Sequence, residues 1–215
     1  MNKVVIFDLD GTLIDSLPDI DDNINLMLSH YGYPSVSINE TRQNIGNGAR
    51  NLVKGSIHTT LTKEELDERL AYYNQIYNAS GSPKTGLFDG VEELIYELKN
   101  RGYKIAILTN KPHESTVRVY NKYLSQFEFD MVVGACDLVK HKPDPDGALF
   151  ILNALNAEPK DAYFIGDGET DVLTSIKAGT NGIAVLWGYR DKDQLEGAGA
   201  TVFATDCKDL LSKIK

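Results

Sequence analysis

Short, almost continuously apolar runs alternate with stretches of helical periodicity along most of the chain. Such runs predict strands of a parallel sheet covered on both faces, because half-exposed strands alternate apolar and polar residues instead. The expected strands are 4–8, 104–109, 131–134, 162–166 and 183–187. Apolar residues three and four apart predict helices over 89–102, 143–157 and 170–180. This order predicts an α/β fold, a Rossmann-like parallel sheet flanked by helices.

Residues 16–83 depart from this alternation, because no run there has the pattern of a buried strand. Apolar residues recur at helical spacing from Ile20 to Leu28 and again from Leu66 to Tyr77. The exit from this stretch, "ASGSPKTGLFDG", is rich in Gly, Ser and Pro, as linkers are. The sequence therefore predicts an all-helical insert, residues 16–83, after the first strand of a core domain formed by 1–15 and 84–215.

Composition excludes several classes of partner. The 215 residues carry a net charge of −9, whereas nucleic acids and anionic membranes attract clustered Lys and Arg. A small anionic substrate in a local basic pocket remains compatible with this charge. The two cysteines, Cys136 and Cys207, favour a reducing compartment. With no apparent signal peptide and no apolar run of about 18 residues, we expect a cytoplasmic protein.

Two aspartates end the first predicted strand, in "VVIFDLDGTLIDS". Side chains two apart on an extended chain point the same way, so Asp8 and Asp10 can face one spot. That spot lies beyond the carboxyl end of the strand, where open α/β sheets bind ligands. Two such carboxylates repel each other and a hard cation relieves the repulsion, which indicates Mg²⁺. The simpler alternative is a pair of aspartates that cap a turn at Gly11.

Polar residues follow the next two strands as well. Thr109 and Asn110, in "ILTNKPH", offer a hydroxyl and an amide that can donate to phosphate oxygens. Lys142, in "KHKPDPDGAL", is able to pair with both a carboxylate and a phosphate. The alternatives are a helix N-cap for the Thr-Asn pair and a solvated surface position for the lysine.

A second acidic group ends the fourth predicted strand, in "YFIGDGETD". Asp167 lies at the strand end, and Asp171 follows one helical turn later. The alternative, a helix N-cap, explains one of these acids, but it explains Asp167, Glu169 and Asp171 together less easily. Because parallel strands end at one edge of a sheet, these acids, the lysine and the neutral donors are expected to meet in one crevice. Such a crevice suits Mg²⁺ and a phosphoryl group.

Four motifs in this order resemble those of the haloacid dehalogenase superfamily: "DLDGT", "TN", Lys142 of "KPDP", and "GDGETD". The helical insert looks like the small cap domain of that superfamily. With "TNKP", "KPDP" and the insert segment "TRQNIGNGARNLV", the chain resembles the phosphoglycolate phosphatase group. The resemblance implies a Mg²⁺-dependent phosphatase acting on a small phosphorylated metabolite, with 2-phosphoglycolate as the expected ester.

The resemblance also implies a role for each motif residue. Asp8 is the expected nucleophile, which forms an aspartyl-phosphate, and Asp10 the general acid and then base. Mg²⁺ is expected on the carboxylates of Asp8 and Asp167 and on the backbone carbonyl of Asp10. The remaining residues are expected to hold the phosphate or to support the site: Thr109, Asn110 and Lys142 around the phosphate, and Asp171 behind the metal, holding water or Lys142.

The insert segment supplies candidates for the rest of the substrate. Gly46 and Gly48 form a flexible turn whose backbone N–H groups are expected to reach the site when the cap closes. Arg50, and also Arg42, are candidates for a substrate carboxylate, since guanidinium binds carboxylates bidentately. The alternative for both is an arginine on an exposed helix face.

Three other functions are alternatives to this phosphatase. A β-phosphoglucomutase-like sugar-phosphate mutase shares the four motifs and the cap, and a pyrophosphatase or nucleotidase of the same superfamily differs only in its substrate. A non-catalytic binding module is expected to lack one of the acids or the lysine, and none is missing. The sequence leaves the choice between monomer and homodimer open.

Overall fold

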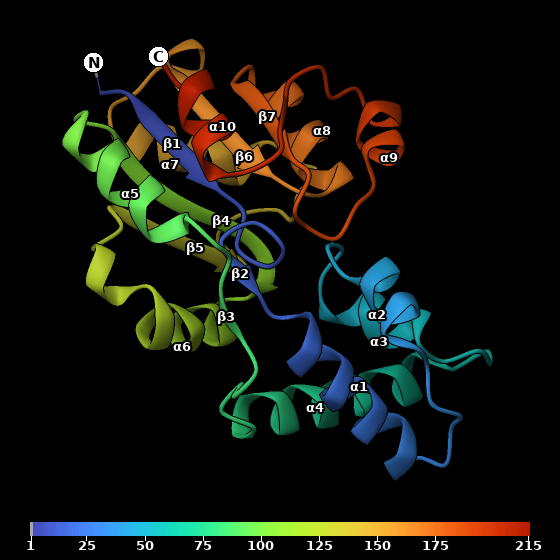
Figure 1. Ribbon diagram of the computed structural model, residues 1–215. Coiled ribbons are helices and arrows are strands. Elements are labelled where there is room, and N and C mark those ends of the chain that lie inside the picture. The colour runs from blue at the N-terminus through green and yellow to red at the C-terminus, as the bar shows by residue number, and fades with distance from the viewer. Residues whose placement is uncertain (1) are drawn as a thin grey trace.

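The computed structural model describes residues 2–215, and a six-stranded sheet forms its centre (Figure 1). All neighbouring strands of this sheet run parallel. In spatial order the strands are β5 (Met131–Ala135), β4 (Lys104–Pro112), β1 (Val4–Phe7), β6 (Ala162–Gly166), β7 (Asn181–Val185) and β8 (Phe203–Ala204). The α/β fold predicted from the sequence is therefore confirmed.

The strand boundaries follow the apolar runs to within one residue, with three exceptions. β7 begins and ends two residues before the predicted 183–187, so Trp187 lies in the loop that follows. β8 was not predicted, because two residues are too short to carry a recognisable pattern. β4 continues past Thr109 to Pro112, with an irregularity in its pairing to β5 after Leu108.

Helices cover both faces of the sheet, as the continuous apolar strands require. In β1, Val5 and Phe7 pack on one side, whereas Val4 and Ile6 pack on the other. The first side is covered by α5 (Val91–Asn100), α6 (His113–Tyr123), the short helix η1 (Ser125–Phe127) and α10 (Cys207–Lys213). The second side packs against α7 (Asp146–Ala154) and α8 (Glu169–Ala178). The short helices η2 (Pro159–Asp161) and α9 (Lys192–Gly197) flank β6 and β8.

Along the chain, four helices lie between β2 and β3: α1 (Leu17–His30), α2 (Ile38–Asn44), α3 (Ala49–Gly55) and α4 (Lys63–Ala79). We call residues 17–79 the cap. Its apolar side chains form their own buried cluster, which includes Ile24, Leu28 and Tyr73. A two-stranded antiparallel ribbon of β2 (Ile14–Asp15) and β3 (Gly86–Leu87) joins the cap to the core, and it was not predicted. Figure 1 shows the cap below the carboxyl edge of the sheet.

The order of the strands places the functional loops. The chain passes from β1 to β4 and β5 on one side, then crosses back to β6 on the other side. The loops after β1 and β6 consequently diverge at a switch point of the sheet, where α/β folds form a crevice. Within residues 2–215 no helix is both long and apolar enough to cross a membrane.

Candidate active site

A buried lysine joins two of the acids predicted from the sequence. The ammonium of Lys142 donates to Asp8 Oδ1 at 2.7 Å and to Asp171 Oδ1 at 2.6 Å. The other oxygen of Asp171 accepts the backbone N–H of Gly168 at 2.9 Å. Both oxygens of Asp171 are thus occupied by the protein. This geometry supports the predicted role of Asp171 behind the metal rather than on it.

Asp167 is held at the end of β6 by two donors. The hydroxyl of Thr12 donates to Oδ1 at 2.9 Å, and the backbone N–H of Tyr189 donates to Oδ2 at 2.8 Å. Gly11 has φ +90°, and a Cβ there would lie 2.3 Å from Asp167 Oδ2. Only glycine therefore lets the turn after β1 pass so close to this carboxylate.

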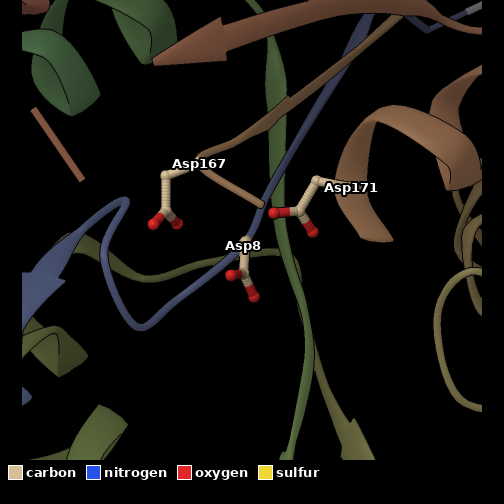
Figure 2. A group of neighbouring side chains, drawn as sticks. All are labelled: Asp8, Asp167 and Asp171. Carbon is tan, nitrogen blue, oxygen red and sulfur yellow. The ribbon is translucent and has the colours of Figure 1, made fainter. Parts of the chain in front are cut away.

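Asp8, Asp167 and Asp171 gather around one point, as Figure 2 shows. One carboxylate oxygen from each lies within 4.8 Å of the others, and all three residues are buried. Burial, followed by repulsion from Asp171, raises the pKa of Asp8 to about 8 although Lys142 opposes the shift. Burial and the charge of Asp171 likewise raise the pKa of Asp167 to about 7.

These residues fit a divalent cation of the Mg²⁺ type. Three buried carboxylates face one ammonium group, so the cluster carries an excess of negative charge that burial makes costly. Hard oxygen ligands are those that Mg²⁺ prefers. Asp8 uses only Oδ1 for a hydrogen bond among residues 2–215, and its second oxygen remains available for a cation or a phosphorus atom.

The side chain of Asn110, predicted to donate to phosphate, bonds to the backbone in this structure. Its amide nitrogen donates to the backbone carbonyls of Gly46 at 3.1 Å and Lys142 at 3.0 Å. Its amide oxygen accepts the backbone N–H of Lys142 at 2.8 Å. Both side-chain donors are thus occupied, and in this arrangement the amide positions Lys142 and the cap loop instead of donating to phosphate. Thr109 accepts the backbone N–H of Lys111 at 3.2 Å and keeps its own hydroxyl proton to donate.

Asp10 lies beside Asp8 but has separate partners. The ammonium of Lys111 donates to both oxygens of Asp10 at 3.0 Å each, and the hydroxyl of Ser16 donates to Oδ1 at 2.6 Å. Burial lowers the pKa of Lys111, but the charge of Asp10, the Tyr77 hydroxyl and the hydrogen bonds to both together raise this pKa above its ordinary value. Lys142 behaves likewise, with Asp171 and Asp8 raising its pKa against burial. Both lysines are therefore charged.

A pocket lies between the core and the cap. With its open mouth it holds about 550 Å³ of space. Asp8, Asp10, Thr109 and Lys111 line the core side. The cap side consists of apolar and aromatic residues, the glycine turn and one polar residue, Asn74: Ile20, Ile45, Gly46, Gly48, Ala49, Leu52, Tyr73, Asn74 and Tyr77. The pocket thus has a charged floor and a mainly apolar roof, the arrangement of a small-molecule site.

The two arginine candidates are not brought into this pocket. Arg50 is half-exposed, forms an ion pair with Asp67 on α4 and is absent from the pocket lining. Arg42 pairs with the exposed Asp191 at 3.1 Å and does not line the pocket either. Gly48, by contrast, lies on the pocket wall, where a Cβ would approach the backbone oxygen of Asn110 to 3.5 Å.

Sequence reasoning missed Lys111, Tyr189 and Arg190. A signal for Lys111 was present, because residues two apart on a strand share a face and Thr109 had been identified. Tyr189 and Arg190 carry no local signal, since they lie in a loop after β7. The Tyr189 hydroxyl accepts the backbone N–H of Ser16 at 2.9 Å, and Arg190 donates to cap carbonyls.

Comparison with known proteins agrees with this geometry. Residues 5–185 match the family model of haloacid dehalogenase-like hydrolases. The chain belongs to this family. Its membership confirms the predicted superfamily and a hydrolytic enzyme. Members generally use Mg²⁺, for which the buried acidic cluster is suited.

Individual relatives narrow the class of hydrolase. Phosphoglycolate phosphatase 1 of Pseudomonas aeruginosa is 36% identical over 97% of this chain and 78% of its own length. The phosphoglycolate phosphatase of Psychrobacter arcticus is 34% identical over 87% of this chain and 84% of its own. A solved structure of a predicted phosphoglycolate phosphatase from Haemophilus somnus superposes with a TM-score of 0.91 at 27% identity, covering 100% and 98% of the two chains. These likenesses support the expected enzyme class, phosphoric monoester hydrolase.

Proposed function

We propose that this hydrolase is a Mg²⁺-dependent phosphatase that cleaves 2-phosphoglycolate through an aspartyl-phosphate on Asp8. The observation that carries the proposal is the contact of Asp8 with Lys142 at the pocket floor. It leaves one carboxylate oxygen of Asp8 without a protein donor and places a buried cation beside it. The names of the relatives support the choice of 2-phosphoglycolate.

The first step is attack of an Asp8 carboxylate oxygen on the phosphorus atom. The bond between phosphorus and the ester oxygen breaks, and the leaving glycolate oxygen takes a proton from Asp10. Lys142, which contacts Asp8, and the Thr109 hydroxyl in the pocket lining are expected to donate to the phosphate oxygens and offset charge on the transferring group. Bound Mg²⁺ would hold Asp8 ionised against the effect of burial, and an ionised carboxylate needs no base to activate it.

The second step hydrolyses the aspartyl-phosphate. Asp10 takes a proton from a water molecule, the water oxygen attacks phosphorus, and the bond from phosphorus to Asp8 breaks to release inorganic phosphate. Asp8, Asp167 and the backbone carbonyl of Asp10 would hold Mg²⁺, which supplies positive charge next to the phosphoryl oxygens. When the cap covers the pocket, its mainly apolar roof is expected to keep out water other than the reacting one.

The test is phosphate release from a panel of esters, with and without Mg²⁺. The panel contains 2-phosphoglycolate, pyrophosphate, glucose phosphates and nucleoside monophosphates. We expect 2-phosphoglycolate to be preferred and Asp8→Asn to abolish release. Asp206→Asn is the matched control, since this exposed residue caps α10 far from the pocket and Asn caps a helix about as well as Asp.

Each rival has its own result in this panel. Preference for pyrophosphate or a nucleotide would replace the proposed substrate and keep the mechanism. Stimulation by a bisphosphorylated sugar, with little phosphate released, would favour a mutase. Equal release by Asp8→Asn and wild type would refute Asp8 as the nucleophile.

A further inference from the structure

A second buried lysine, Lys111, lies in the pocket and is not needed for attack on phosphorus. It follows Thr109 on the same face of β4, so its side chain enters the pocket from the core. Only 5% of the side chain is exposed. Its ammonium donates to both oxygens of Asp10 and lies 4.7 Å from the ring centroid of Tyr77 on α4. Lys111 therefore spans the junction of core and cap.

Lys111 is the cation that a bound substrate meets beyond its phosphate. Among the described residues that line this pocket it is the single lysine or arginine. Lys142 is not part of this lining, since its ammonium is bound to Asp8 and Asp171, and Arg50 pairs with Asp67 outside the pocket. The remainder of the pocket wall is mainly apolar or aromatic. A second negative charge on the substrate consequently has one cationic partner in this pocket.

The contact of Lys111 with Asp10 is one that the reaction must change. Asp10 has to face the leaving ester oxygen, yet in this structure its oxygens accept three donors, two from Lys111 and one from Ser16. An ammonium group retains its charge when buried only with an anionic partner. A substrate carboxylate is able to replace Asp10 as that partner, which frees Asp10 for the ester oxygen.

We propose that Lys111 is the specificity-determining residue that binds the carboxylate of the substrate, exchanging Asp10 for it. This inference rests on the proposed function and deepens it. It assigns to Lys111 the carboxylate recognition that the sequence suggested for Arg50. It also gives a reason for a charged residue under an aromatic roof, since the Tyr77 ring keeps the ammonium close to the substrate when Asp10 is released.

The experiment compares two esters that differ in one group. In 2-hydroxyethyl phosphate, CH2OH replaces the carboxylate of 2-phosphoglycolate. We expect wild type to prefer 2-phosphoglycolate, and Lys111→Met to lower kcat/KM for it about 30-fold, or about 2 kcal/mol at 1.36 kcal/mol per tenfold change. The same variant is expected to change kcat/KM for 2-hydroxyethyl phosphate less than about threefold. Lys111→Arg, which keeps the charge, is expected to retain most of the preference.

Two controls separate recognition from misfolding. Lys140→Met removes an exposed lysine that pairs with Asp144 and lies outside the pocket lining, so it is expected to alter neither kcat/KM value. Thermal melting of Lys111→Met checks its fold, since Asp10 then keeps Ser16 and its partial exposure to water. Equal losses on both esters would overturn the proposal and leave Lys111 as a positioning residue for Asp10.

Binding of non-hydrolysable analogues distinguishes this inference from the proposed function. In 3-phosphonopropionate a CH2 group replaces the ester oxygen, and 3-hydroxypropylphosphonate is the counterpart that lacks the carboxylate. Calorimetry is expected to show tighter binding of 3-phosphonopropionate to wild type, and equal binding of both to Lys111→Met. If this difference holds while 2-phosphoglycolate is not hydrolysed, the proposed substrate fails and carboxylate recognition stands. If wild type binds both analogues equally, the proposal for Lys111 is wrong.

Discussion

Arg190 connects the core to the cap, and replacing it with Met tests how the cap is held over the pocket. The guanidinium is buried and donates from Nε to Glu169 at 2.8 Å. Its other nitrogens donate to three backbone carbonyls at the end of α2: Arg42 at 2.8 Å, Gln43 at 3.1 Å and Ile45 at 2.5 Å. Met keeps the apolar stem and removes every donor.

The size of the effect follows from these three contacts. When the cap moves away, water can satisfy the carbonyls, so only the net value of each hydrogen bond is lost, about 1 kcal/mol. Three such bonds give about 3 kcal/mol, which is about a 150-fold change in the ratio of the observed cap position to an open one. Because the proposed mechanism needs the cap over the pocket, we expect Arg190→Met to lower kcat/KM by about two orders of magnitude.

The assay is steady-state hydrolysis at saturating Mg²⁺, which separates cap position from metal affinity. Arg101→Met is the matched control, because Arg101 also pairs with a glutamate, Glu97 at 2.9 Å, and donates to two carbonyls, yet lies remote from the pocket. It is expected to leave kcat/KM unchanged. An Arg190→Met enzyme within about threefold of wild type would refute the reasoning.

Three further predictions concern stability and the metal. Since burial and the charge of Asp171 raise the pKa values of Asp8 and Asp167 to about 8 and 7 from 3.8, the metal-free folded state binds more protons than the unfolded state from about pH 4 to 8. Its Tm should therefore fall as pH rises through that window, and more steeply without Mg²⁺ than with it. Plots of Tm against pH that run parallel with and without Mg²⁺ would contradict this. Gly188→Ala places a Cβ 2.3 Å from the Asp167 side chain, so weaker Mg²⁺ binding is expected by calorimetry, and unchanged affinity would exclude the clash. Ile24→Ala in the cap cluster should cost about 3 kcal/mol in urea unfolding, against less than about 0.5 kcal/mol for the exposed Leu26→Ala on the same helix.

Much of the fold was predictable because its strands are buried on both faces. β1 and β6 appear in the sequence as apolar runs with no polar residue to break them, and the structure places them where the runs are. The ribbon of β2 and β3 was not predictable, since two strands of two residues are formed by pairing across more than 70 positions. No local periodicity records such a pairing.

The sequence by itself determined which residues lie at the carboxyl ends of the strands. Asp8, Asp167 and Lys142 were identifiable because each follows a buried strand, and a parallel sheet brings such ends together. The contact of Lys142 with Asp8 joins residues 134 positions apart, and it agrees with that expectation.

Only the tertiary structure decided how the cap completes the pocket. The sequence suggested Arg50 as the partner of a substrate carboxylate and did not suggest Lys111, but α3 turns Arg50 toward Asp67 while β4 directs Lys111 inward. The amide of Asn110 likewise donates to the backbone carbonyls of Gly46 and Lys142, which lie 64 and 32 residues away in the sequence. Which donors remain free depends on the packing of one domain against another, and that packing is a property of the whole chain rather than of any segment.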